Sequence, residues 1–97
     1  MRIIARRTLR EYGDNEPGAK SALDSWYHEA KKGYWKKPSD IKEQYGHASI
    51  VGNNRVVFNI AGNKYRLVVR IDYSAGMIFI RFIGTHAKYD EIDVETI

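Results

Sequence analysis

The feature that most constrains the fold is a change of hydrophobic period near the middle of the chain. Before residue 48 the apolar residues recur at helical spacing, and after it they alternate with polar residues as in strands. The gaps between the alternating runs hold glycine, asparagine or serine, which favour tight turns. The predicted strands cover residues 48–51, 55–60, 65–73 and 77–84. Hairpin turns join neighbouring strands in opposite directions, so we expect a largely antiparallel sheet.

The first half predicts a short strand and the helices that cover the sheet. Residues 1–5 suit a strand, and Thr8 with Glu11 forms a capping-box pattern that predicts the start of a helix. Pro17 suits the first position of a second helix, and Ser39 suits the cap of a short helical turn. The second helix has one apolar stripe, formed by Ala22, Leu23, Trp26, Tyr27 and Ala30. We therefore expect an α+β fold, in which a mostly antiparallel sheet of about four to five strands packs against N-terminal helices.

The two longest runs predict how the sheet is covered. Residues 65–73 alternate, so one face of this strand is expected in the core and the other in solvent. The solvent face would hold Arg66, Val68, Arg70 and Asp72. Residues 77–84 are apolar on both faces, which is typical of a central strand covered on both sides. The two predicted faces are Ile78, Ile80 and Phe82 against Met77, Phe79 and Ile83.

Composition excludes several classes of protein. With 97 residues, of which 43% are hydrophobic and 29% charged, the chain fits one ordered domain over residues 1–97. It has no cysteine, which excludes disulfides and thiolate metal sites. The N-terminal segment is too short and too charged for a signal peptide or a membrane span. We expect a cytoplasmic protein without membrane contact.

Charge is distributed unevenly along the chain. The net charge is +4, but residues 48–88 hold six basic residues against one acid. The last nine residues reverse this sign, so they are expected to fold back over the basic face or to reach a basic partner. The acids there are Asp90, Glu91, Asp93 and Glu95. A second basic run, residues 31–37, encloses Tyr34 and Trp35, a mixture also found in proteins that bind single-stranded RNA. Packing between helix and sheet is the simpler explanation for Trp35.

A polar cluster follows the last predicted strand. It consists of Thr85, His86, Lys88, Tyr89 and Asp90. A histidine in a basic field suits proton transfer near neutral pH, and a hydrogen bond to the backbone is the alternative role for His86. Lys88 can neutralise charge that develops on a phosphate, and Asp90 can orient His86 or accept a proton. Tyr89 can stack on a base, donate to a phosphate or close the edge of the core.

Arg66 is the candidate phosphate-binding residue, because a guanidinium on a regular strand offers parallel donors in a fixed geometry. Arg81 is expected close to the polar cluster, whereas Arg55 and Arg70 suit ordinary surface positions. No glycine-rich phosphate loop, cysteine nucleophile or spaced pair of metal-binding histidines is present. We therefore expect no cofactor and no metal, and cleavage of RNA by this chain would use the 2′-hydroxyl as the nucleophile.

Several segments together resemble the HigB toxins of the RelE-like superfamily. In the second half they are Arg55-Val-Val-Phe-Asn59, Gly62-Asn-Lys-Tyr-Arg-Leu-Val-Val-Arg70, Phe79-Ile-Arg-Phe-Ile-Gly-Thr-His86 and Tyr89-Asp90. In the first half they are Arg2-Ile-Ile, Thr8-Leu-Arg-Glu11, Trp26-Tyr27, Lys31-Lys32 and Lys36-Lys-Pro-Ser-Asp-Ile-Lys42. The resemblance therefore extends over nearly the whole chain.

The resemblance implies the toxin of a type II toxin–antitoxin pair, which enters the ribosomal A site and cleaves messenger RNA there without a metal. It also implies a HigA-like helix-turn-helix antitoxin as partner, with DNA contacted only through that antitoxin. Arg66 matches the phosphate-binding arginine of the family, and His86 and Tyr89 fall where its C-terminal catalytic group lies. The expected catalytic residues are Arg66, His86, Lys88 and Tyr89. The expected RNA-binding residues are Arg55, Asn59, Asn63, Lys64, Arg81 and Asp90.

One departure from the family leaves the general base open. RelE itself carries lysines on the strand before the arginine hairpin, whereas this chain has Val56, Val57, Phe58 and Asn59. The base is therefore open among His86, Lys88, Tyr89 and Asp90, with His86 favoured. The alternative function is a non-nuclease toxin of the same fold that binds a protein target such as gyrase, and a third is a non-catalytic RNA-binding domain. A protein that only binds its target needs no proton-transfer group beside a phosphate-binding residue. The combination of Arg66 with His86 and Tyr89 therefore favours the nuclease.

Overall fold

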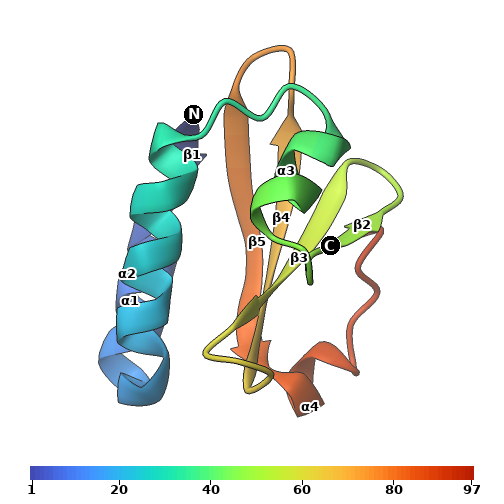
Figure 1. The fold of residues 1–97 in the computed structure, drawn as a ribbon. Helices are drawn as coiled ribbons and strands as arrows, with labels where there is room; N and C mark the ends of the chain where they lie inside the picture. The colour runs from blue at the N-terminus through green and yellow to red at the C-terminus, as the bar shows by residue number, and fades with distance from the viewer.

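Five strands form one sheet with helices packed against it, in a computed structural model that describes residues 1–97 (Figure 1). In chain order the elements are β1 (Arg2–Ile4), α1 (Arg6–Asn15), α2 (Pro17–Lys32), α3 (Pro38–Gln44), β2 (Ser49–Val51), β3 (Arg55–Ile60), β4 (Tyr65–Asp72), β5 (Met77–Thr85) and α4 (His86–Tyr89). The strand order is β1-β5-β4-β3-β2. The predicted α+β fold is confirmed, and so is the central place of β5.

The sheet is antiparallel except at one edge. Strands β2 to β5 follow one another as hairpins, whereas β1 lies parallel to β5. The register pairs Ile3 with Ile78, so the start of the chain lies beside its last strand. Both edge strands, β1 and β2, are only three residues long. Asn53 and Asn54 have φ values of 59° and 60° in the β2–β3 turn, a conformation that asparagine tolerates better than most residues.

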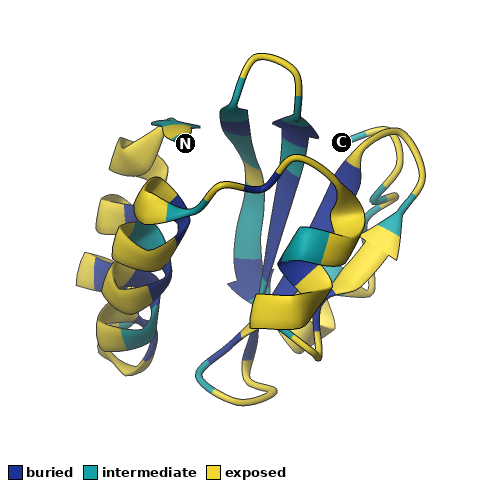
Figure 2. Ribbon diagram, turned by 45° about the horizontal axis from the view of Figure 1, so that its top comes forward, coloured by how far each residue is buried: buried dark blue, intermediate teal, exposed yellow.

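The main core lies between the helices and one face of the sheet, and the buried sides of the elements turn toward each other in Figure 2. Its centre is aromatic. Phe58 of β3 contacts Trp26 of α2 with ring centroids 5.3 Å apart, and it stacks on Trp35 at 5.9 Å. Trp35 therefore packs between helix and sheet, as its sequence position suggests. None of the helices has both the length and the apolar composition needed to cross a bilayer.

Two predicted helix caps are wrong. Helix α1 begins at Arg6 directly after β1, with Ala5 at its N-cap and no side-chain cap bond, so Thr8 lies inside the first turn. Helix α3 begins at Pro38, with Lys37 at the N-cap, which puts Ser39 inside that helix as well. Inside a helix a hydroxyl no longer faces the free N–H groups that it would cap. Helix α3 instead has Pro38 at its first position, where proline is favoured.

A β-bulge in β5 changes the predicted faces of this strand. Ile80 pairs with Val69 but Phe82 pairs with Val68, so Arg81 is an extra residue. Beyond the bulge the alternation is reversed. Phe82 therefore shares a face with Val68 rather than with Ile80, and Ile83 packs against the main core in its place. Val68 is fully buried, so the expected solvent face of β4 is covered at its centre.

Candidate functional site

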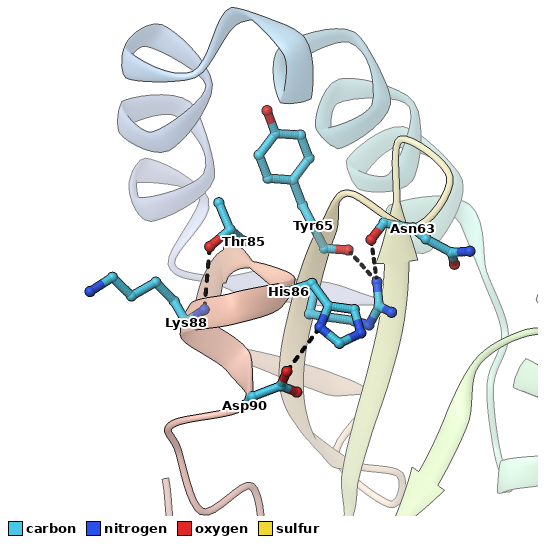
Figure 3. Close-up of polar contacts among 7 residues, drawn as sticks. Asn63, Tyr65, Thr85, His86, Lys88 and Asp90 are labelled. Carbon is cyan, nitrogen blue, oxygen red and sulfur yellow. Dashed lines mark hydrogen bonds and ion pairs between the residues drawn. The ribbon is translucent and has the colours of Figure 1, made fainter.

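The polar cluster after β5 lies at one end of the sheet, beside the turn that joins β3 to β4. Arg66 of β4 pairs with Gly84 of β5. The backbone N–H of His86 donates to the carbonyl of Lys64 at 3.2 Å, and this bond holds the start of α4 against β4. The structure therefore brings the predicted phosphate-binding and proton-transfer residues to one place. Figure 3 shows His86 and Lys88 on α4, with Thr85 and Asp90 at its two ends, next to Tyr65 at the start of β4 and Asn63 in the preceding turn.

Backbone carbonyls, and no acid, hold the guanidinium of Arg66. Its Nη1 donates to the carbonyl of Asn63 at 3.0 Å and to that of Tyr65 at 3.2 Å. No ion pair includes Arg66. Because the two carbonyls occupy Nη1, the edge formed by Nε and Nη2 is left for a ligand, and it has two parallel donors. The side chain is thus oriented and keeps an unneutralised charge, which suits two-point binding of a phosphate.

His86 is oriented by Asp90 across one turn of α4. Nδ1 of His86 lies 3.1 Å from Oδ2 of Asp90, and the two side chains are 53% and 60% exposed. A carboxylate only accepts, so of the two neutral tautomers it selects the one with its proton on Nδ1 and its lone pair on Nε2. Thr85 supports the turn, because its Oγ1 accepts from the N–H of Lys88 at 3.3 Å. Nε2 of His86 is therefore available to take up a proton.

The other two predicted catalytic residues are held less firmly. The ammonium of Lys88 lies 3.7 Å from the carboxylate of Glu91, and both side chains are largely exposed. Figure 3 shows the Lys88 side chain extending away from His86 and Asp90. Tyr89 is half-buried at the last position of α4, and its hydroxyl forms no hydrogen bond within the chain. His86 and Arg66 are thus the more strongly oriented members of the predicted catalytic set.

Three predicted RNA-binding residues lie next to Arg66. Asn59 of β3 pairs directly with Arg66, and Nδ2 of Asn59 lies 3.4 Å from Oδ1 of Asn63. Lys64 follows in the same turn and is exposed. Asn59 and Asn63 also line a hollow of about 490 Å³ between this turn and the segment that leads into β2. Its lining includes Tyr45, Gly46, His47 and Phe58. Amides and aromatic rings at its wall suit a flat polar ring such as a nucleobase.

The structure places the other two basic residues, Arg55 and Arg81, beneath the C-terminal tail, residues 90–97. Nη1 of Arg55 donates to the carbonyl of Asn53 at 2.8 Å, and Nη2 donates to the carbonyl of Ile97. Nε of Arg81 donates to the same Ile97 carbonyl at 3.3 Å. Arg55 is only 8% exposed, so the ordinary surface position expected for it is wrong, because the tail covers it. These two arginines therefore bind the tail in this conformation, whereas Arg66 does not.

The tail has an apolar side and an acidic side. Ile92, Val94 and Ile97 are half-buried. Glu91, Asp93 and Glu95 are exposed between them. Figure 1 shows the tail running from α4 back toward β2, and the contacts with Arg55 and Arg81 put it on the sheet face opposite the main core. Of the two expectations for this acidic segment, folding back over the basic face is the one that the structure shows.

Gly84 is a site residue that sequence reasoning missed. A Cβ at this position would lie 2.6 Å from Cζ of Phe82, because the phenyl ring covers the glycine. Any larger residue would push this ring away, next to the strand position that carries Arg66. The signal was a glycine inside a strand that is otherwise apolar on both faces. It could not be interpreted without the bulge that brings Phe82 to this face.

Tyr65 fastens the helices to the strand end that holds Arg66. Its hydroxyl lies 3.3 Å from Oε2 of Glu16, at the junction of α1 and α2, and its ring meets Tyr12 edge to face. Burial raises the pKa of Tyr65 above its usual value, and the Glu16 carboxylate raises it further. The hydroxyl thus keeps its proton and donates to Glu16. This contact anchors the carbonyl of Tyr65, which in turn accepts from Arg66.

A family model and several known proteins that match this chain all belong to the HigB toxins. Residues 19–92 match the model of a family described as HigB toxin, RelE-like toxic component of a toxin-antitoxin system. Over 92 residues the chain is 28% identical to the mRNA interferase toxin HigB of Escherichia coli K12, which covers 93% of this chain and 88% of that protein. The mRNA interferase HigB of Shigella flexneri matches to the same extent. That of Escherichia coli O6:H1 is 24% identical over 94 residues, or 95% of this chain and 91% of the relative.

Proposed function

Because the chain belongs to the HigB family, the RelE-like toxic components of toxin–antitoxin systems, we propose that it is a ribosome-dependent endonuclease of messenger RNA. The observation that carries the proposal is the pairing of a fixed, unneutralised Arg66 with a histidine whose Nδ1 is held by Asp90. A phosphate clamp beside a proton acceptor is the minimum that RNA cleavage by its own 2′-hydroxyl requires. The relatives named mRNA interferase support the same activity.

The proposed reaction needs two proton transfers and one phosphate clamp. Nε2 of His86 removes the proton of the 2′-hydroxyl, whose oxygen attacks the adjacent phosphorus. The bond from phosphorus to O5′ breaks, which leaves a 2′,3′-cyclic phosphate on one product and a 5′-hydroxyl on the other. Arg66 binds the non-bridging oxygens as negative charge grows on them. Tyr89 or Lys88 supplies the proton that O5′ takes up, and no metal has a part in the reaction.

Ribosome dependence is proposed because the site is incomplete by itself. His86, Asp90 and Lys88 are largely exposed, so water screens them and few groups are left to align a flexible RNA. A ribosome that presents the messenger in one conformation would provide this alignment. We also propose a HigA-like helix-turn-helix antitoxin as the partner that restrains the toxin, with DNA contacted only through it.

The experiment that tests the proposal adds purified protein to translating ribosomes and maps the ends of the messenger by primer extension. The wild-type protein is expected to cut the messenger, and Arg66→Ala is expected to leave it intact. Arg70→Ala is the matched control, because Arg70 lies four residues further along β4 with its guanidinium over Phe79 at 5.3 Å. An intact messenger with wild type would refute the nuclease. Equal cutting by both variants would refute the role of Arg66 and leave the activity standing.

A second readout separates the nuclease from a toxin that binds a protein target. Supercoiling by purified gyrase is measured with the wild-type chain and with Arg66→Ala. The proposal expects no inhibition by either protein. Inhibition of gyrase together with an uncut messenger would establish the alternative on the same fold.

A further inference from the structure

The basic run that sequence analysis singled out forms a surface of its own, at the other end of the sheet from Arg66. Helix α2 ends at Lys32, and the connection to α3 passes over the end of the sheet (Figure 1). In Figure 2 this connection is exposed apart from a short buried stretch. We call the exposed side chains here the lysine patch: Lys31, Lys32, Tyr34, Lys36 and Lys37.

The charges of the lysine patch have no acidic partner within the chain, and the nearest interaction is that of Nζ of Lys31, which lies 5.9 Å from the ring centroid of Tyr27. None of its four lysines takes part in an ion pair. Lys31 and Lys32 lie in the last turn of α2, where a cation interacts favourably with the helix dipole. The carbonyls of Lys31 and Gly33 nevertheless already accept from the amino group of Met1, at 2.7 and 3.3 Å. Helix capping therefore does not account for these lysines, and it does not apply to Lys36 and Lys37.

Three acids lie near the lysine patch, and one of them, Glu43 of α3, lines a hollow together with Tyr34 and Asp40 and forms no ion pair. The carboxylate of Asp72 accepts from the hydroxyl of Ser74 at 2.9 Å and from the N–H of Ala75 at 3.1 Å, within its own turn. That of Asp40 accepts from the backbone N–H of Lys36 at 3.0 Å. Neither acid forms an ion pair with a lysine of the patch. The patch thus keeps a local excess of positive charge.

Tyr34 is presented to solvent by a rigid neighbour. It is 86% exposed, the largest exposure among the large hydrophobic side chains. Trp35 points the other way, stacks on Phe58, and donates from Nε1 to Oε1 of Gln44 at 3.1 Å. The backbone of the segment is therefore held from beneath, so stacking on Tyr34 has to order only this side chain. Beside it lies a hollow of about 550 Å³, bounded by Lys31, Lys32 and Lys36 and by the β4–β5 turn.

We propose that the lysine patch is a second RNA-binding surface, which binds the phosphates of single-stranded RNA and stacks an unpaired base on Tyr34. Exposed aromatic rings among cations are the arrangement that binds single strands without sequence preference. A protein partner fits less well, since protein interfaces have an apolar centre and Tyr34 stands alone among charges. The other exposed large hydrophobic residue, Ile50, belongs to β2.

The position of the lysine patch makes it a second contact. Strand β4 runs from Tyr65, beside the candidate active site, to Asp72, beside the patch, and its eight residues span roughly 23 Å. RNA bound to the patch is therefore remote from His86. Binding there needs no cleavage, so the inference stands or falls separately from the nuclease. In a nuclease, it would hold the protein on structured RNA while the opposite end acts on the messenger.

The test measures binding of a fluorescent twelve-nucleotide oligouridine at several KCl concentrations. All proteins carry His86→Ala, so that the probe stays intact. The patch variant is Lys31→Gln with Lys32→Gln. The matched control is Arg7→Gln with Lys20→Gln, which removes the same charge from side chains that pair with Glu11 and Asp14. The patch variant is expected to lower the slope of log affinity against log salt by about 1.4, at about 0.7 per phosphate contact. The control is expected to keep the slope.

Stacking is tested separately at Tyr34. Tyr34→Ala is expected to weaken binding about 5- to 150-fold, whereas Tyr34→Phe keeps the ring and the affinity. Circular dichroism of each variant checks that the fold is intact. Equal slopes for patch variant and control, or full affinity of Tyr34→Ala, would overturn the proposal. It would also be overturned if the patch variants bound oligouridine normally but lost binding to a purified antitoxin, since the patch would then serve a protein partner.

Discussion

The two ends of the sheet hold their charged groups in different ways. At the end with Arg66 and His86, carbonyls or a carboxylate fix each group in one orientation. At the end with the lysine patch, four lysines extend into solvent without an ion pair. Fixed groups suit a reaction, in which atoms must meet at short range, and mobile charges suit a polyanion, which can bind in many registers. If both proposals hold, one small sheet carries the chemistry at one end and the attachment to RNA at the other.

The largest expected difference between the two ends concerns His86. His86→Ala should lower the cleavage rate on translating ribosomes about 100- to 10,000-fold, the usual contribution of a general base. The rate is measured at a saturating concentration of ribosomes, where weaker binding to the ribosome does not lower it. Lys31→Gln with Lys32→Gln should keep the rate at saturation and require more ribosomes to reach it.

The matched histidine control for this variant is His28→Ala. Nδ1 of His28 lies 2.8 Å from the carbonyl of Asp24 on α2, away from the site. Its cleavage rate should equal that of wild type. A loss of rate at saturation in the double lysine variant would erase the distinction between the two ends.

The turns at the two ends should respond oppositely to exchanges of glycine and alanine. Ala61, in the β3–β4 turn, has a φ of 52°, and Gly76, in the β4–β5 turn, has one of 67°. A left-handed backbone is costly for any residue with a Cβ, so Ala61→Gly should raise the free energy of unfolding by about 1 kcal/mol. Gly76→Ala should lower it by about 1–2 kcal/mol, since a Cβ there meets open space and only the backbone is strained. Urea denaturation measures both, and a shift of both in one direction would contradict the strain at Ala61.

A smaller effect is expected for the residue that orients His86. Asp90→Asn keeps the size of the side chain but removes the carboxylate at Nδ1. Because the pair is exposed, its contribution of about 0.2–1 kcal/mol corresponds to at most a fivefold fall in cleavage rate. The rate is compared with that of Asp93→Asn, an exposed acid of the tail. A fall as large as that of His86→Ala would mean that Asp90 itself takes the proton.

The smallest effect concerns Asp72 at the patch end. Hydrogen bonds from the N–H of Ala75 and the hydroxyl of Ser74 lower the pKa of Asp72 below its ordinary value of 3.8. A lowered pKa in the folded state contributes stability that is present above 3.8 and is lost as the pH falls through the folded value. Asp72→Asn should therefore lower Tm at pH 7 and have less effect in stronger acid. A difference in Tm that persists at pH 2 would show that the turn, rather than the charge, is responsible.

Much of the sheet was predictable because its information is local. The turns at 52–54, 61–64 and 73–76 fix the hairpins, and alternation fixes the strands within a residue or two. The bulge at Arg81 was not predictable, since an extra residue leaves the composition of a strand unchanged and shows only in its pairing. The two predicted helix caps were wrong because α1 begins directly after β1 and α3 begins at Pro38, each before the hydroxyl that was expected to cap it.

The candidate site likewise has one part that the sequence predicts and another part that it does not. The nearness of Arg66 to His86 follows from the β4–β5 hairpin, whose register a sequence can suggest. The burial of Arg55 and the contact of Arg81 with the tail depend on a segment that begins at residue 90 and crosses the sheet. The acidic charge of the tail was compatible with folding back over the sheet and with reaching toward a basic partner. The packing of the half-buried Ile92, Val94 and Ile97 selects the first of these two arrangements. The assignments of His86, Tyr89 and Lys88 to proton transfer stay predictions.

The parallel pairing of β1 with β5 determines when the sheet can form during synthesis of the chain. Ile3 can pair with Ile78 only after β5 has left the ribosome, so the sheet cannot close while most of the chain is still being synthesised. Arg66 on β4 and His86 after β5 likewise emerge later than helices α1 to α3. A growing chain therefore has no assembled candidate site until β5 has emerged.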